Sequence, residues 1–261
     1  MDGIEWLGYV VGMRFCLFSF ALLAQAADPL FHASFNKGVD AEKSPGDRRI
    51  HSAPDYKHLD AGKPGLAGTG VVHENGALHF TQKNTQAVYF PAQGLSPVKG
   101  TISFFLQLDP KLDLAPGYVD PLQLTDKDYN NSALWVDFTK DERYFRLGVF
   151  GELSAWNPKG IDSDKNPDFN GRLVVVKQPP FARGKWTHVA ITYSKLGSGK
   201  GEARLYLDGA LQGTSSLVKE PFTWQAGKPT LRLGVGYSGW LDEVAVYGRT
   251  LSAREIGKIR R

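Results

Sequence analysis

The sequence predicts an all-β fold built from antiparallel sheets, and three observations support this prediction. Apolar and polar residues alternate with a period of two along several segments, which is typical of strands with one face in a core and the other in water. The 261 residues include 29 Gly and 15 Pro, a composition that favours many short elements separated by turns over long helices. A hydrophobic content of 42%, with 12% aromatic residues, excludes a disordered chain.

The clearest alternation predicts strands at residues 101–108, 133–138, 144–150, 186–193, 203–208 and 240–247. Each of the first three has one apolar face, which we expect to point into the core. The residues on these faces are Ile102, Phe104, Leu106 and Leu108, then Leu134, Val136 and Phe138, then Phe145, Leu147 and Val149. Asp208-Gly209, at the end of the fifth strand, is a hairpin-turn signal between residues 205–207 and Leu211.

One short C-terminal helix is expected over residues 252–260. Ser252 is a typical N-cap, and Glu255 three positions later completes a capping box. Leu251, Ile256 and Ile259 are its apolar docking residues. Two long segments lack a strand pattern, residues 36–70 and 154–171, and loops of that length are usually functional or mobile.

The N-terminus reads as a signal peptide over residues 1–26, with Met13 as the expected start. Arg14 precedes an apolar run over residues 15–24, and Ala24-Gln25-Ala26 is a small-x-small cleavage site. The apolar run is about half the ~20 residues of a spanning helix, so no membrane span is expected after cleavage. Export to the periplasm, the cell surface or the medium follows. The alternative is a buried strand or helix at the start of a domain, and residues 27–261 are expected to form one domain.

The cysteine content restricts the possible covalent and metal cross-links, and the net charge restricts the class of binding partner. The single Cys16 excludes an intramolecular disulfide and a cysteine-based zinc site. The formal net charge is +4 and the basic residues are scattered, apart from Lys258–Arg261. Outside the cytoplasm this favours acidic glycans or cell-surface polymers over nucleic acid, and the alternative is an ordinary solvated surface.

Four motifs carry a family resemblance. They are W-x-H-V-A at 186–190, L-Y-L-D-G at 205–209, G-x-L-D-E-V at 239–244 and L-S-x-x-E-I at 251–256. With this spacing the chain resembles the laminin G-like, concanavalin A-like lectin/glucanase domains of exported bacterial proteins, over roughly residues 100–256. The resemblance implies a two-sheet antiparallel jelly-roll sandwich, opened by a strand at 31–35, with a concave sheet that often holds glycans. It implies no particular ligand, because the superfamily includes lectins, lyases, hydrolases and adhesion modules.

The residues that alternate with the predicted core faces suggest a binding surface. If they share the open face of one sheet, aromatic rings could stack on sugars while polar groups bond the hydroxyls or an acidic substituent. The candidate carbohydrate-binding residues are Gln123, Trp135, Asp137, Tyr144 and Arg146. This predicts a non-catalytic recognition module for a polysaccharide or cell-surface glycan. Two alternatives remain: the face binds a surface protein, or loops cover it and Asp137–Arg146 is a buried ion pair.

Catalysis is not predicted from the sequence. Glycoside hydrolysis requires two carboxyl groups that flank one bond, and the chain lacks the E-x-D-x-x-E strand motif of the superfamily's glucanases. Asp242 and Glu243 are adjacent and therefore point to opposite faces of a strand. There is no G-x-S-x-G nucleophile motif, and His188 belongs to the fold motif. A hydrolase or lyase remains the less favoured alternative, with no catalytic residue assigned.

A structural calcium ion is a further expectation. Oxygen ligands occur at alternate positions in a loop, at Asp162, Asp164, Asn166 and Asp168. The loop is not an EF-hand, because its sixth position is Pro167 and its twelfth is Leu173. The resemblance separately implies a structural calcium near the first strand that would use Asp242, although Asn36 stands where Asp is more usual.

Overall fold

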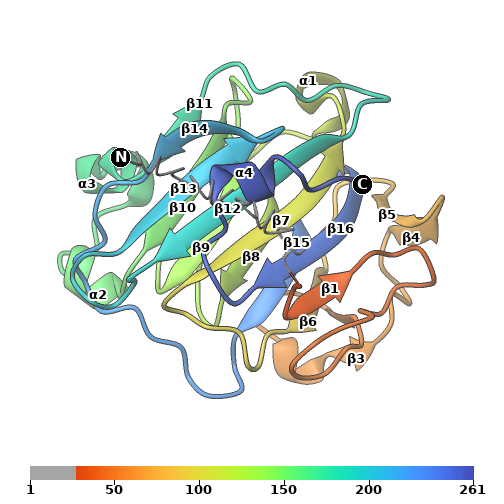
Figure 1. The fold of residues 1–261 in the computed structure, drawn as a ribbon, viewed down its shortest axis with the longest axis horizontal. Helices are drawn as coiled ribbons and strands as arrows, with labels where there is room; N and C mark the ends of the chain where they lie inside the picture. The colour runs from red at the N-terminus through yellow and green to blue at the C-terminus, as the bar shows by residue number, and fades with distance from the viewer. Residues whose placement is uncertain (1–27) are drawn as a thin grey trace, which may run out of the picture.

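Two antiparallel β-sheets of eight strands each pack face to face in the computed structural model of the chain (Figure 1). The structure describes residues 28–261, so the predicted signal peptide lies outside the described residues. Within that range, no helix has the length and apolar character needed to cross a membrane. The predicted all-β sandwich with a short C-terminal helix is confirmed.

The first sheet, called sheet A here, has the order β14-β13-β12-β7-β16-β5-β4, and β1 pairs with β16. β12, β13 and β14 are consecutive neighbours, as are β4 and β5, whereas β16 from the C-terminal region lies between β7 and β5. The strands are β1 (Phe31–Ala33), β4 (Val71–Glu74), β5 (Ala77–Phe80), β7 (Gly100–Gln107), β12 (Thr187–Ser194), β13 (Glu202–Leu207), β14 (Ala210–Thr214) and β16 (Gly239–Tyr247).

The second sheet, sheet B, has the order β11-β10-β9-β8-β15-β6-β2-β3. Its strands are β2 (His51–Ala53), β3 (Lys63–Pro64), β6 (Ala87–Pro91), β8 (Val119–Thr125), β9 (Ala133–Phe138), β10 (Phe145–Phe150), β11 (Val174–Val176) and β15 (Thr230–Val235). The helices are α1 (Pro110–Asp113), α2 (Leu153–Trp156), α3 (Pro167–Gly171) and α4 (Ala253–Ile256), with 3₁₀ turns η1 (Leu59–Ala61) and η2 (Ser163–Lys165).

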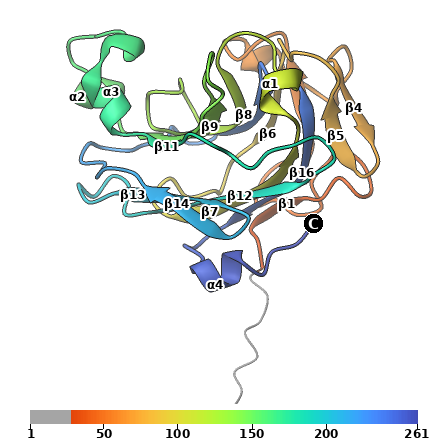
Figure 2. The same cartoon turned by 90° about the horizontal axis from the view of Figure 1, so that it is seen from above.

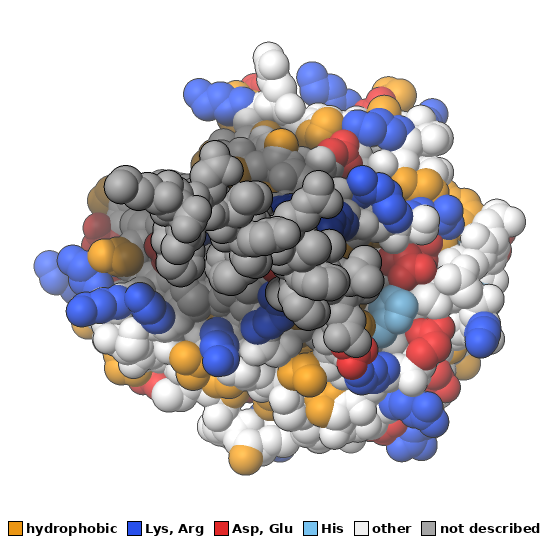
Figure 3. All heavy atoms as spheres, in the orientation of Figure 1, with side chains coloured by type: hydrophobic (Ala, Val, Ile, Leu, Met, Phe, Trp, Pro, Cys, Tyr) orange, Lys and Arg blue, Asp and Glu red, His pale blue; other side chains and the backbone are white. Residues whose placement is uncertain are grey.

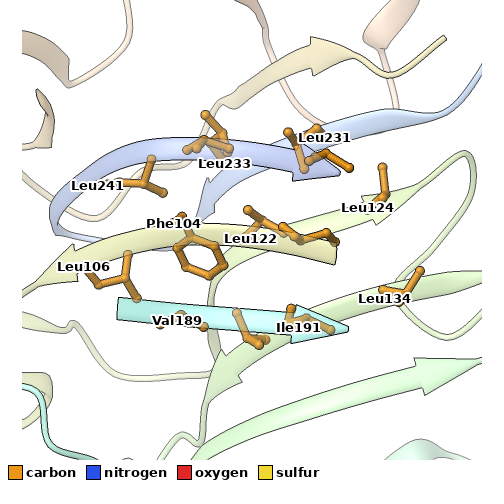
Figure 4. Close-up of a cluster of buried hydrophobic side chains, with 14 of the residues drawn as sticks. Phe104, Leu106, Leu122, Leu124, Leu134, Val189, Ile191, Leu231, Leu233 and Leu241 are labelled. Atoms are coloured by element: carbon orange, nitrogen blue, oxygen red, sulfur yellow. The ribbon is translucent and has the colours of Figure 1, made fainter. Parts of the chain in front are cut away.

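The core lies between the sheets and consists of the predicted apolar faces. Phe104 and Leu106 of β7 belong to one cluster with Leu122 and Leu124 of β8, as Figure 4 shows, and all are fully buried. The inward residues predicted for β9 and β10 are likewise buried in this cluster. Burying one such side chain stabilises the fold by about 1.5–3 kcal/mol, so strand periodicity determines which face each sheet turns inward.

Two predicted local structures are confirmed. Asp208 and Gly209 both have positive φ, 48° and 82°, as a tight two-residue hairpin turn requires, and they join β13 to β14. Ser252 and Glu255 form the capping box that starts α4. Leu251 and Ile256 then pack on the outer face of sheet A, where α4 lies in Figure 2.

The two segments predicted as long loops contain short elements. Residues 36–70 include β2, η1 and β3, and residues 154–171 include most of α2, all of η2 and all of α3. β2 is only three residues long, which is too short for an alternating pattern to be detected in the sequence. Its extended conformation depends on pairing with β6. Asn166 caps α3 and Pro167 occupies its first turn, which is a helix-start pattern that the calcium interpretation overlooked.

Charged side chains are mixed on the surface. On the face shown in Figure 3, basic and acidic side chains are interspersed among the described residues. This agrees with the scattered Lys and Arg of the sequence and with a formal charge of only +4. No large field of one sign is visible on that face outside the grey region.

Candidate functional site

The outer face of sheet B carries polar side chains from three adjacent strands. Asp137 of β9 is paired in register with Arg146 of β10, and Trp135 of β9 lies opposite Gly148 of β10. Asp120 lies within an irregularity in the pairing of β8 with β9, between Val119 and Leu122. The face therefore presents two carboxyl groups and one guanidinium close together.

Asp137 and Arg146 form a buried ion pair. Arg146 Nε donates to Asp137 Oδ1 at 2.8 Å, and Nη2 donates to Oδ2, so the contact is bidentate. The residues are only 3% and 9% exposed. Burial raises the pKa of Asp137, and the bonds from Arg146 oppose that rise. This is the covered arrangement that the sequence left open as an alternative.

Trp135 is not available as an open stacking surface, and the expectation that it would be is wrong. Its side chain is 1% exposed, because Phe150 and Phe169 stack along it with ring centroids at 6.0 and 6.3 Å. Phe169 belongs to α3, in the segment that folds over this end of sheet B. A Cβ atom at Gly148 would lie 2.2 Å from the indole, so the absent side chain provides the space the ring fills.

A cavity of about 220 Å³ remains beside the covered ring. Tyr118 and Tyr129 line it and are 40% and 41% exposed, so aromatic surface is accessible there. The Tyr118 hydroxyl donates to Asp164 Oδ1 at 3.0 Å, and the Tyr129 hydroxyl lies 3.1 Å from Ser163 Oγ. These bonds hold both rings against η2. The cavity thus has an aromatic rim and a polar base.

Asp120 gives the base of the cavity an unusual carboxyl group. Burial, together with the nearby Asp137 carboxylate, raises the pKa of Asp120 to about 8. Gln123 Nε2 donates to Asp120 Oδ2 at 2.6 Å, while Oδ1 accepts no hydrogen bond from the described residues. The Arg146 guanidinium carbon lies 5.1 Å from the centre of the Tyr118 ring. Around neutral pH the cavity therefore contains a protonated carboxyl beside an ion pair.

The raised pKa of Asp120 predicts pH-dependent stability. The folded pKa of about 8 exceeds the ordinary value of 3.8, so the folded state retains a proton that the unfolded chain has lost. The free energy of unfolding should fall as the pH rises from about 4 to about 8. Urea unfolding at pH 5, 7 and 9 should show this decline, and Asp120→Asn should reduce it. The exposed Asp60→Asn variant is the control, and an unchanged slope in Asp120→Asn would contradict the prediction.

The remaining predicted sugar-binding residues take other places. Gln123 is buried, and its Oε1 accepts a bond from Arg232 at 3.4 Å, so it supports the cavity from beneath. Tyr144 precedes β10 and does not line the cavity. The prediction missed Asp120, Tyr118 and Tyr129. A strand prediction for residues 119–125 would have placed Asp120 and Gln123 beside β9.

The predicted calcium ligands of the loop do not converge. Asp162 and Asn166 cap η2 and α3 by accepting bonds from the backbone N–H groups of Asp164 and Asp168, each at 2.9 Å. Asp164 accepts the Tyr118 hydroxyl, and its other oxygen lies 3.8 Å from Lys140 Nζ. In residues 28–261, no group of three or more His, Cys, Asp or Glu side chains is arranged to hold a metal ion.

Asp242 faces a cation of the chain itself. Arg261 Nε donates to Asp242 Oδ2 at 2.6 Å, and the Glu243 N–H donates to Oδ1 at 2.8 Å. Burial raises the pKa of Asp242 to about 6, which Arg261 opposes. The Arg261 guanidinium also lies 4.1 Å from the centre of the Trp186 ring. The calcium ion that the resemblance implied at Asp242 does not fit this arrangement.

Comparison with known families gives one match. A family model described as the concanavalin A-like lectin/glucanases superfamily matches residues 82–257, well over half of the chain. Among curated proteins, no sequence matches significantly.

Three solved structures with the same fold are similar to this chain. Domain 4 of AbnA, a GH43 extracellular arabinanase from Geobacillus stearothermophilus, was solved with arabinotriose and gives a TM-score of 0.54 at 15% identity, covering 89% of this chain and 98% of that one. The receptor-binding domain of botulinum neurotoxin type G gives 0.53 at 11% identity, covering 89% and 50%. The binding domain of botulinum neurotoxin DC, in complex with SialylT, gives 0.53 at 11%, covering 87% and 49%. This chain therefore spans about half of each neurotoxin chain, and the similarity shows the fold.

Proposed function

Because the chain belongs to the concanavalin A-like lectin/glucanase superfamily, we propose that it is a carbohydrate-recognition module and that the cavity on sheet B holds the sugar. The family model that matches residues 82–257 confirms the predicted family. One observation carries the proposal: the cavity combines the accessible rings of Tyr118 and Tyr129 with the polar groups of Asp120 and Arg146. Ligand sites typically pair aromatic walls with a few convergent polar groups in this way.

The chemistry of the cavity matches a sugar ring. The C–H face of a pyranose or furanose can lie against an exposed tyrosine ring, while its hydroxyls exchange hydrogen bonds with carboxyl and guanidinium groups. A protonated Asp120 both donates and accepts, which suits a hydroxyl. At about 220 Å³ the cavity is smaller than the ~300–1,000 Å³ of most small-molecule sites. It therefore suits one sugar unit or the end of a chain.

The charges around the cavity favour a neutral sugar. Three carboxyl groups line it, those of Asp120, Asp137 and Asp164, against the single guanidinium of Arg146. That guanidinium is already paired with Asp137, so little positive charge remains for a uronic acid or a sulfate. An acidic ligand would also lie against the Asp164 carboxylate. We therefore propose a neutral, hydroxyl-rich glycan in place of the acidic glycan that the net charge of the sequence favoured.

The structural neighbours support sugar binding as a class. The arabinanase domain was solved with arabinotriose, and one neurotoxin binding domain was solved with SialylT. Export also belongs to the proposal, since residues 13–26 carry the signal-peptide pattern. A module that recognises a polysaccharide works where polysaccharides are exposed, outside the cytoplasm.

One observation favours a second candidate function, glycoside hydrolysis. Asp120 and Asp137 are neighbouring carboxyl groups of which one is protonated near neutral pH, and glycosidases use such a pairing. Binding remains the better-supported function, because Asp137 is 3% exposed and both its oxygens are held by Arg146. A carboxylate in that position lacks a free oxygen to attack a sugar or activate a water. New reducing ends released from an oligosaccharide, and lost in Asp120→Asn, would establish the enzyme instead.

Tyr129→Ala tests the proposed site. Removing the ring should weaken sugar binding by about tenfold, or about 1.4 kcal/mol, because the stacking surface is lost. The midpoint of unfolding should change little, since Tyr129 is 41% exposed. Isothermal titration of the purified protein with arabinotriose, xylotriose and cellotriose measures both affinity and stoichiometry.

The control is Leu211→Ala, a 54% exposed residue on β14 of the other sheet, which should bind like the wild type. The proposal fails if none of the sugars binds, or if Tyr129→Ala binds every sugar as tightly as the wild type.

A further inference from the structure

A second cavity, of about 330 Å³, lies at the end of sheet A, where β5 and β7 end and β16 begins. It shares no lining residue with the cavity on sheet B. Its walls include Trp240, His79 and Gln107, with Asp113, Arg183 and Ser238. Neither the fold nor the proposed function accounts for it.

Three of these residues come from adjacent strands at one register position. Trp240 of β16 is paired with His79 of β5 on one side and with Gln107 of β7 on the other. Paired residues point to the same face of a sheet, and adjacent strands lie about 4.8 Å apart. The side chains of His79, Trp240 and Gln107 therefore stand in a row across sheet A.

The aromatic pair in this row forms a fixed stack, called the platform here, in which His79 covers one face of the Trp240 indole, so a ligand meets the other face or the ring edge. The His79 and Trp240 rings are stacked, with centroids 4.0 Å apart and planes only 5° from parallel. His79 Nδ1 is hydrogen-bonded to Glu74, which holds the imidazole in place. Both His79 and Trp240 remain partly exposed. A large aromatic ring held rigidly at the surface costs little further entropy when a ligand binds to it.

The backbone under Trp240 is fixed as well. Gly239 has a φ of 132°, and a Cβ there would lie 2.7 Å from the Tyr237 hydroxyl and 3.0 Å from the Leu108 Cβ. The buried Tyr237 donates a hydrogen bond from that hydroxyl to the Trp240 carbonyl at 3.0 Å. The position of Trp240 is thus set by the core beneath it, so the platform exists before any ligand arrives.

Polar groups beside the platform are available to a ligand. The Gln107 amide makes no side-chain hydrogen bond to the described residues, although it is only partly exposed and lines the cavity. Arg183 is held over the cavity by its bonds to Asp113 and keeps 64% of its side chain exposed. An amide and a guanidinium next to an aromatic platform can bind hydroxyl groups while the ring packs against C–H groups.

We propose that this cavity is a second carbohydrate-binding site, in which a sugar ring packs on Trp240 and its hydroxyls bond to Gln107 and Arg183. The site stands independently of the cavity on sheet B, because it lies on the other sheet and uses different residues. A protein with two such sites binds a polysaccharide bivalently. Its retention on long or surface-attached chains then exceeds the affinity of either site for a short sugar.

The test uses short sugars to count the binding sites on each protein chain. Arabinotriose, xylotriose and cellotriose are titrated into the wild type, Trp240→Ala, Tyr129→Ala and the double variant, by calorimetry and by tryptophan fluorescence. We expect two binding events per wild-type chain for at least one sugar. Trp240→Ala should lose one event, with affinity there at least tenfold weaker, and keep the other. Tyr129→Ala should show the opposite pattern, and the double variant should lose both events.

Two further variants distinguish the loss of a ligand contact in Trp240→Ala from a loss of folding. Gln107→Ala removes only the amide and should weaken the same event that Trp240→Ala removes. Trp240→Phe keeps a ring and should recover part of the binding. The proposal is overturned if Trp240→Ala and Gln107→Ala bind all three sugars like the wild type, if Tyr129→Ala alone abolishes all binding, or if the wild type binds none of them. If instead every binding event depends on Trp240 and Tyr129→Ala binds like the wild type, the sheet B site is overturned and the Trp240 site stands.

Discussion

Replacing Trp135 by alanine is expected to lower the free energy of unfolding by about 3–5 kcal/mol, the usual cost of deleting a large buried aromatic side chain. The ring is 1% exposed and is stacked between β10 and α3 through Phe150 and Phe169. Its Nε1 also donates to the Tyr129 carbonyl at 2.6 Å, so the variant loses a part-buried hydrogen bond as well. Urea unfolding followed by far-ultraviolet circular dichroism measures the loss.

Trp135→Phe is the matched variant for this test. It keeps part of the aromatic stack and should cost less than the alanine change. Trp135→Ala should weaken sugar binding only indirectly, by displacing α3 and the neighbouring Tyr129. A stable Trp135→Ala variant that has lost the Tyr129-dependent binding event would show instead that the indole is exposed in solution, and that α3 does not cover it.

Replacing Arg146 by methionine is expected to destabilise the fold by about 3–5 kcal/mol, because it leaves the Asp137 carboxylate buried without its counter-ion. The two side chains are 10% and 4% exposed and share two hydrogen bonds. The loss should shrink at low pH, where Asp137 takes up a proton and the buried charge disappears. Unfolding in urea at two pH values measures both effects.

A double-mutant cycle separates the pair from its surroundings. Asp137→Leu combined with Arg146→Met replaces both charges by apolar groups and should recover much of the lost stability, since an unpaired buried charge is the main cost. Arg204→Met is the control. Arg204 pairs with Glu202 at the surface, with 45% and 34% of the side chains exposed, so its loss should stay within about 0.5 kcal/mol. Additive losses in the Asp137–Arg146 cycle would contradict the coupling.

Most of the fold could be predicted from the sequence because its strands are amphipathic. Strands such as β9 and β10 alternate clearly, and the alternation alone identified which side chains enter the core. The turn at Asp208-Gly209 and the capping box of α4 are local structures whose residue types determine their geometry. β2 and β3 could not be predicted, because their few residues are strands only through pairing, β2 with β6 and β3 with β2.

The candidate site was predicted in part. The Asp137–Arg146 contact follows from strand register, which the periodicity of β9 and β10 indicates. The covering of Trp135 by Phe169 could not be predicted, because it depends on how α3 folds back over sheet B. Asp120 was missed because residues 119–125 were not recognised as a strand. An irregularity between Val119 and Leu122 also shifts the register there.

Because Trp135 and Gly148 approach so closely, the residue type at each of these two positions restricts the residue type that the other can accept. While the indole occupies the space over β10, any side chain at 148 would collide with it, and while 148 has no side chain, loss of the indole leaves a void. Either change alone is therefore costly, whereas a smaller residue at 135 together with a side chain at 148 can be tolerated. Among relatives of this chain, we expect the two positions to vary together, and lineages that keep tryptophan at 135 to keep glycine at 148.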